Sequence, residues 1–186
     1  MAFPIVRKRF NVDEYHAMAR AGILHEDDRV ELIEGEILEM TPIGSRHAGC
    51  VTRLNRLLLS RLGDTAVVSV QNPILLNDDS EPQPDLMILR RREDFYSTAH
   101  PGPADVLLLI EVADSSLEAD REFKAPLYGR HGIHETWVVD LERSLVESHF
   151  DPDPEGYRRV QIFRRGESIS PQAFPDLSLT ISEIFG

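Results

Sequence analysis

One short segment constrains the fold of this chain more than any other. Residues 106–113, VLLLIEVA, form a nearly continuous apolar run in which Glu111 is the one charged residue. A run of this kind is typical of a strand that is buried on both faces, inside a sheet with layers packed on either side. Residues 135–140, ETWVVD, predict a second buried strand. The chain is therefore expected to fold around a sheet that other elements cover.

Helix signals flank these strands. The expected helices are residues 11–22, 45–62 and 117–131, each followed or closed by a glycine. Asn11 and Glu14 have the spacing of a capping box, which indicates where the first helix begins. Pro126 lies within the third. Because a proline in mid-helix costs about 3 kcal/mol, it should kink that helix or set its first turn just upstream.

The remaining apolar segments predict further strands. They are an N-terminal hairpin at residues 29–40 with its turn near Glu34 and Gly35, strands at 65–71, 73–76 and 85–90, and a C-terminal hairpin of 144–150 and 157–163. Residues 177–186 are expected to pack back on the body. This order indicates an α/β (α+β) fold, with a mixed central sheet flanked by helices and an extra hairpin at each end. No linker divides the sequence, so one domain over residues 1–186 is predicted.

Two acids stand at the same end of the apolar strands. If residues 85–90 and 106–113 pair as an antiparallel hairpin in which Arg90 faces Val106, the same register places Asp85 opposite Glu111. Directly opposed residues have Cβ atoms about 4.5–5.5 Å apart, which is close enough for two carboxylates to share a cation. A buried charge without a partner is unfavourable, so a metal ion or a basic group is expected beside them.

The third predicted helix adds further polar residues. Asp120, Lys124 and Tyr128 are spaced by four residues and His131 follows three later, so they share a face if the helix forms. An ordinary acid–lysine pair beside a half-buried tyrosine has the same spacing. The buried strand before this helix favours the functional interpretation, because it delivers the helix next to the Glu111 end of the sheet.

The order of these motifs resembles a known superfamily. The segments PQPDLMIL, LLLIEVADSS and DREFKAPLYGRHGIHETWVVD are similar to the PD-(D/E)xK restriction-endonuclease-like proteins, and in particular to a large, little-characterised branch of predicted endonucleases. The ELIEGE segment at residues 31–36 belongs to the same pattern. The similarity runs from about residue 10 to residue 165. The resemblance implies a restriction-endonuclease-like fold with a mixed sheet between helices.

The sequence departs from the usual superfamily pattern at one position. Ala113 occupies the place of the lysine two residues after the glutamate. In the branch that this chain resembles, the lysine has moved to the following helix, which makes Lys124 the candidate. The resemblance also implies that an early acid, Glu34 or alternatively Glu31, completes the metal pocket.

The activity implied is metal-assisted hydrolysis of a DNA phosphodiester bond, with Asp85, Glu111 and Lys124 as the catalytic set. Asp85, Glu111 and the Val112 carbonyl would bind Mg²⁺ or Mn²⁺, the ions that hard oxygen ligands favour. Lys124 would orient the attacking water or stabilise the charge that develops on the phosphate. The candidates for supporting roles are His47, Gln71, Asp120 and Tyr128.

The net charge of −12 limits the partners of this chain. Binding to nucleic acid depends largely on lysine and arginine, so a DNA-binding surface would have to be local. The arginines are clustered at residues 90–92, 158–159, 164–165 and along the helix at 53, 56 and 61. The acidity and the missing lysine at position 113 favour an alternative, a catalytically inactive member of the fold that acts as an oligomeric binding or assembly protein. A hydrolase of another phosphoester is a third hypothesis.

Location and assembly are expectations of a more general kind. The chain has no apolar run long enough for a membrane span or a secretory signal, so no membrane association and a cytoplasmic location are expected. A lone cysteine, Cys50, fits a reducing compartment. The apolar C-terminal half, which contains Trp137, makes a homodimer the expected assembly.

Overall fold

The computed structural model describes residues 6–25 and 27–186. Its centre is a six-stranded mixed sheet in the order β3-β4-β5-β6-β7-β8. The strands are β3 (Ala66–Val70), β4 (Leu86–Arg90), β5 (Val106–Ala113), β6 (Glu135–Asp140), β7 (Leu145–Asp153) and β8 (Gly156–Arg164). Only β5 and β6 run parallel within this sheet, and every other neighbouring pair is antiparallel. The predicted fold class is confirmed.

Smaller elements surround this sheet. The helices are α1 (Val12–Arg20), α2 (Ser45–Leu62), α3 (Leu117–Ala119), α4 (Ala125–Arg130) and α5 (Ile181–Phe185). Two small antiparallel sheets consist of β1 (Val30–Ile33) with β2 (Glu36–Glu39), and of β9 (Ser168–Ile169) with β10 (Leu179–Thr180). Both predicted hairpins form, and the capping box of Asn11 and Glu14 opens α1. Within the described residues no helix is both long and apolar enough to cross a bilayer.

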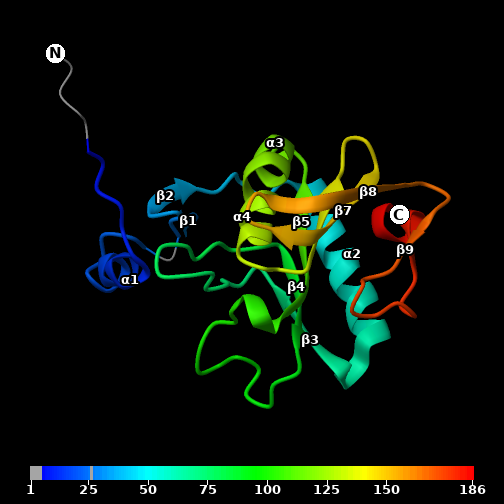
Figure 1. Cartoon of the computed structure of the whole chain (residues 1–186), viewed down its shortest axis with the longest axis horizontal. Coiled ribbons are helices and arrows are strands. Elements are labelled where there is room, and N and C mark those ends of the chain that lie inside the picture. Colours follow the sequence, from blue (N-terminus) through cyan, green and yellow to red (C-terminus); the bar gives the residue numbers. More distant parts are fainter. Residues whose placement is uncertain (1–5, 26) are drawn as a thin grey trace.

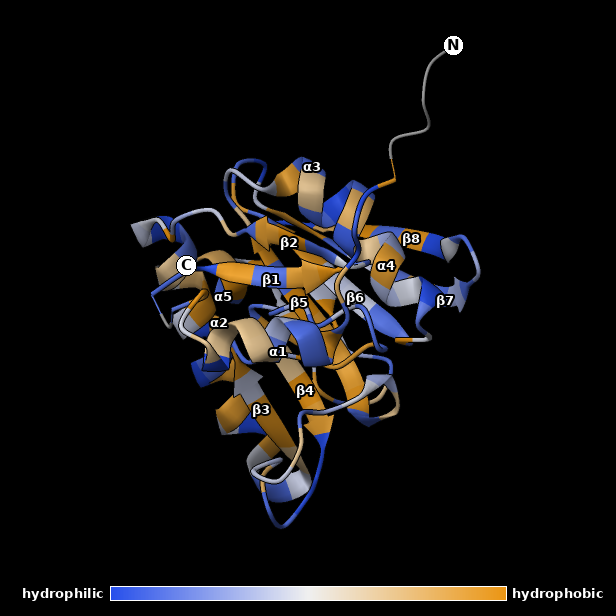
Figure 2. Cartoon of the chain, turned by 90° about the vertical axis from the view of Figure 1, so that its left-hand side faces the viewer, coloured by the Kyte–Doolittle hydropathy of each residue, from blue (hydrophilic) through white to orange (hydrophobic). Residues whose placement is uncertain are grey.

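The alternation of side chains along the central strands sorts the core into two layers. Leu86 and Ile88 of β4 pack with α2 and α5 on one face of the sheet, whereas Met87 and Leu89 pack with α4 on the other. Figure 1 shows α2 and the C-terminal segment to one side of β5, with α4 and the β1–β2 hairpin to the other. In Figure 2, β3 and β4 are coloured largely as hydrophobic. Glu111 is the single acid of β5, a strand that is otherwise apolar.

The register of β4 and β5 agrees with the prediction at one end only. Leu86 pairs with Ile110 and Ile88 with Leu108, the register in which Asp85 stands opposite Glu111. A β-bulge between Ile88 and Leu89 then shifts the pairing by one residue, so that Leu89 and not Arg90 faces Val106. The expected Arg90–Val106 pair is wrong because the bulge leaves Leu107 of β5 unpaired.

One other local prediction needs correction. Residues 73–76 form no strand, although Ile74 N–H bonds to the Pro82 carbonyl and Leu76 N–H to the Ser80 carbonyl. The facing segment contains Pro82 and Pro84, which have no N–H, so a regular ladder cannot continue there. The third helix is continuous over residues 117–130, and it is irregular near Pro126 as predicted. Residues 120–124 form a π turn (η3), and Pro126 lies in the first turn of α4.

Candidate active site

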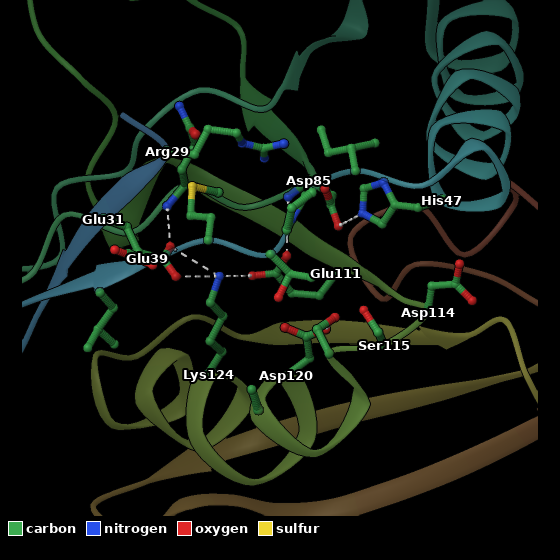
Figure 3. A pocket seen from close by; sticks show the side chains of 18 of the residues that line it. Arg29, Glu31, Glu39, His47, Asp85, Glu111, Asp114, Ser115, Asp120 and Lys124 are labelled. Carbon is green, nitrogen blue, oxygen red and sulfur yellow. Dashed lines mark hydrogen bonds and ion pairs between the residues drawn. The ribbon is translucent and has the colours of Figure 1, made fainter. Parts of the chain in front are cut away.

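A cavity of about 260 Å³ lies beside the C-terminal half of β5. It is bounded by the β1–β2 hairpin, by the beginning of α2 and by the segment that runs from β5 through the π turn. Figure 3 shows side chains from all these segments turned toward the same space. Six acids line it, namely Glu31, Glu39, Asp85, Glu111, Asp114 and Asp120.

Asp85 and Glu111 are linked by backbone hydrogen bonds. The Asp85 N–H donates to Glu111 Oε2 at 3.2 Å, and the Val112 N–H donates to Asp85 Oδ2 at 2.9 Å. Asp85 directly precedes β4, and its side chain reaches the backbone of β5. The two carboxylates that the sequence places opposite each other are therefore neighbours in the cavity.

Lys124 reaches this acid pair from the π turn. Its Nζ lies 2.8 Å from Glu31 Oε1 and 3.7 Å from Glu111 Oε1. The π turn arises where Pro126 has no N–H to donate, and the Ala125 N–H bonds instead to the Asp120 carbonyl five residues back. Lysine, acid pair and Glu31 thus form one connected cluster (Figure 3).

Of the other three residues on the predicted helix face, two lie in or beside the cavity and one lies outside it. The Tyr128 hydroxyl donates to Glu111 Oε1 at 2.6 Å. Asp120 lines the cavity and accepts a hydrogen bond from the Ser116 hydroxyl. His131 is outside the cluster, because its Nδ1 lies 2.8 Å from the Leu127 carbonyl one turn back in its own helix. The shared face therefore includes three of the four residues proposed from spacing.

Burial sets the charge state of this cluster. It raises the pKa of Glu111 above the usual range of a glutamate, and Lys124 only partly opposes that shift. Burial raises the pKa of Asp120 as well. Burial would lower the pKa of Lys124, but the carboxylates of Glu111 and Glu31 outweigh it and raise this pKa, so the lysine is charged at neutral pH. Six acids therefore share the cavity with two strong cations, Arg29 and Lys124, and an added cation would favour the ionised forms of the buried acids.

Asp85 is held by two polar side chains from other segments. His47 Nε2, near the beginning of α2, lies 2.9 Å from Asp85 Oδ2, and Gln71 donates to Asp85 Oδ1 at 3.3 Å. The hydrogen bond to Asp85 raises the pKa of His47. The other ring nitrogen of His47 is buried and has no hydrogen-bond partner among the described residues. His47 and Gln71 thus fix the orientation of Asp85.

Glu34, which the sequence analysis preferred as the early acid, is not in the cavity. It occupies the β1–β2 turn with φ of 49°, is 47% exposed, and pairs with Arg130 at 2.8 Å. Glu31 lines the cavity instead, and its side chain is 6% exposed. The turn directs residue 34 outward, whereas the period of two along β1 puts Glu31 and Arg29 on one side. Arg29 was missed, although that alternation would have indicated it once Glu31 was chosen.

The six-stranded mixed sheet, with helices on both faces and an acid pair beside its parallel strands, defines a restriction-endonuclease-like protein. Residues 12–182 match the model of the Uma2 family, described as "Putative restriction endonuclease". The chain belongs to this family, and the resemblance found in its motifs is confirmed.

One solved structure agrees with this fold over almost its whole length. A "putative nuclease belonging to DUF820" from Anabaena variabilis superposes with a TM-score of 0.75 at 18% identity, over 95% of this chain and 97% of that one. The type IIG restriction endonuclease BpuSI gives a TM-score of 0.44 at 18% identity, over 78% of this chain and 16% of that one. No functionally curated protein gives a significant match.

Proposed function

We propose that this protein is a metal-dependent endonuclease that hydrolyses DNA phosphodiester bonds. The observation that carries this proposal is the meeting of Asp85, Glu111 and Lys124 in one cavity, although they come from three separate segments. The family and the fold support the same class of activity.

The donor atoms of the site fit a hard divalent cation. Asp85 and Glu111 supply carboxylate oxygens, and the Val112 N–H points toward Asp85. Because the N–H and C=O of one residue leave a strand on the same edge, the Val112 carbonyl faces that side too. These three groups would hold Mg²⁺ or Mn²⁺, since both ions prefer oxygen ligands. When bound, the ion lowers the pKa of a coordinated water and stabilises negative charge on the phosphate.

The protein's own residues supply positioning and charge. Lys124 provides a fixed positive charge beside the acid pair, where it would stabilise the anionic phosphate as negative charge develops. Glu31 holds the lysine in place, and Tyr128 restrains Glu111. Glu31 replaces Glu34 as the early acid of the proposed site.

A cleavage assay with matched variants tests this function. Supercoiled plasmid and linear DNA are incubated with Mg²⁺ or Mn²⁺, and products are followed on gels. Asp85→Asn and Lys124→Met should each lower the rate by about 100-fold or more, as expected when one electrostatic contact to the reacting group is removed. Glu34→Gln makes a similar change outside the cavity and should keep the rate. Full activity in both cavity variants would refute the assignment.

The alternative is a non-catalytic binding or assembly protein. It is favoured by the interactions that the site residues already make with one another. Lys124 is paired with Glu31, and the carboxylates of Glu111 and Asp85 already accept hydrogen bonds. In the described part of the chain, no three His, Cys, Asp or Glu side chains are grouped closely enough to hold a metal ion. This alternative predicts no cleavage with any metal, and an oligomer that Asp85→Asn leaves intact in light scattering. The homodimer and the cytoplasmic location stay predictions.

A further inference from the structure

A second hollow, of about 770 Å³, adjoins the proposed active-site cavity. Arg29, Ile43 and Gln83 line both spaces, so the hollow continues the cavity directly. Its far side is formed by the C-terminal part of α1, and Gln71 lines it close to Asp85. Its volume lies within the range of about 300–1,000 Å³ that is usual for ligand sites.

The sign of the charge changes between the two spaces. Six acids line the cavity, against Arg29 and Lys124 as strong cations. Among the described residues, the hollow is lined by two arginines, Arg20 and Arg29, against one acid, Asp28. The carboxylate of that acid is already engaged, because it accepts the His25 N–H at 2.8 Å. A polyanion that enters the acidic cavity would therefore meet its compensating positive charge in the hollow.

Arg29 stands at the boundary. Its backbone is fixed, because the Met40 N–H bonds to the Arg29 carbonyl at 2.7 Å and so extends the β1–β2 ladder by one pair. Figure 3 shows the Arg29 guanidinium over the cavity on the side of Asp85. Lys124 is paired with Glu31, whereas Arg29 makes no ion pair within residues 6–25 and 27–186. Its donors are available for an anion.

We propose that Arg29 binds a backbone phosphate of a DNA strand that runs from the cavity into this hollow. The inference rests on the proposed nuclease function and adds the path of the substrate. The paired N–H donors of a guanidinium match the spacing of two phosphate oxygens. The amides of Gln71 and Gln83, which can both donate and accept hydrogen bonds, lie along the same path.

Binding of labelled DNA tests the proposal without requiring cleavage. The fluorescence anisotropy of a fluorescein-labelled oligonucleotide is measured in EDTA and, separately, with Ca²⁺. Arg29→Gln should weaken binding about 10-fold and lower the salt dependence by roughly one phosphate contact. Arg91→Gln is the matched control, because Arg91 is exposed beyond the opposite end of β4. Equal weakening by both variants, no weakening by Arg29→Gln, or no binding by the unmodified protein in either buffer would overturn the proposal.

A second pair of variants tests the path by shape and not by charge. Ala19 is exposed on α1 and lines the hollow, whereas Ala17 is exposed on the same helix outside it. Ala19→Trp should weaken DNA binding several-fold and Ala17→Trp should not. Equal effects would overturn the path.

Failure of this inference and failure of the proposed function can be told apart. DNA binding that depends on Arg29, in a protein that never cleaves, would refute the nuclease and leave the inference standing. DNA cleavage with the same KM in Arg29→Gln as in the unmodified protein would refute this inference and leave the proposed nuclease function standing.

Discussion

Replacing Lys124 with methionine should lower the free energy of unfolding by about 3–5 kcal/mol. Methionine keeps much of the length of the side chain but removes its charge. The lysine side chain is 13% exposed, and its two carboxylate partners, Glu31 and Glu111, are 6% and 4% exposed. The substitution therefore leaves buried acids without their cation, which is more costly than losing an exposed pair.

The size of this effect can be separated from general damage to the core. In a chain of this length, 1 kcal/mol corresponds to about 2–4 °C in the midpoint of thermal unfolding, so the expected loss is about 10 °C. Adding Glu31→Gln to Lys124→Met should recover part of it, because the amide oxygen can still accept the Gln83 N–H. The coupling energy in the double-mutant cycle should be at least about 1.5 kcal/mol.

Urea unfolding followed by circular dichroism provides the measurement, with linear extrapolation to water. Lys8→Met is the control, since Lys8 pairs with Glu14 at 2.7 Å but both side chains are exposed, at 62% and 41%. That variant should leave the midpoint nearly unchanged. The reasoning fails if Lys124→Met is no less stable than Lys8→Met. It also fails if Glu31→Gln lowers the free energy of unfolding as much in the Lys124→Met protein as it does alone.

Three further predictions follow from particular contacts. Mn²⁺ at 100 times its Kd should raise the stability by about 2.7 kcal/mol in thermal-shift assays; Asp85→Asn should abolish this gain and Glu34→Gln should keep it. Gly129→Ala should unfold the protein at a far lower urea concentration, because its Cβ would lie 2.1 Å from the carbonyl oxygen of Gly156 at the start of β8. Gly49→Ala, with open space around its Cβ, should stabilise α2 by about 0.5–1 kcal/mol. Burial lowers the pKa of His149, so the unfolded chain binds the extra proton first and stability should fall as pH drops below about 6.5; the fall should be shallower in His149→Gln.

The fold could be predicted from sequence where one local signal was sufficient. The apolar runs gave β5 and β6, and capping residues placed the beginning of α1. Prediction failed where the outcome depends on a partner segment. Residues 73–76 have strand composition, but the prolines opposite them prevent a ladder. The bulge after Ile88 likewise depends on how the following loop closes, and no local pattern encodes it.

The candidate site shows the same division. The sequence could place Asp85 opposite Glu111 because β4 and β5 follow one another along the chain and pair as antiparallel neighbours. Choosing between Glu31 and Glu34 required the direction of the hairpin relative to the sheet, which is a tertiary property. Arg29 was harder still to predict from the sequence. Its proposed role depends on the adjoining hollow and on the ion pair between Glu31 and Lys124, which are both tertiary features.

The absence of a lysine at position 113 has a packing explanation. Ala113 is 1% exposed and packs against Ala125 and Val138, so the helix approaches β5 through two small side chains. That close approach brings the π turn over the acid pair, and Lys124 immediately precedes Ala125. A lysine side chain at position 113 would occupy the volume that the helix now fills, and the helix could no longer deliver Lys124 to Glu111. Alanine on the strand and lysine on the helix are therefore one structural solution, in which the small residue lets the charged group reach the cavity from the helix.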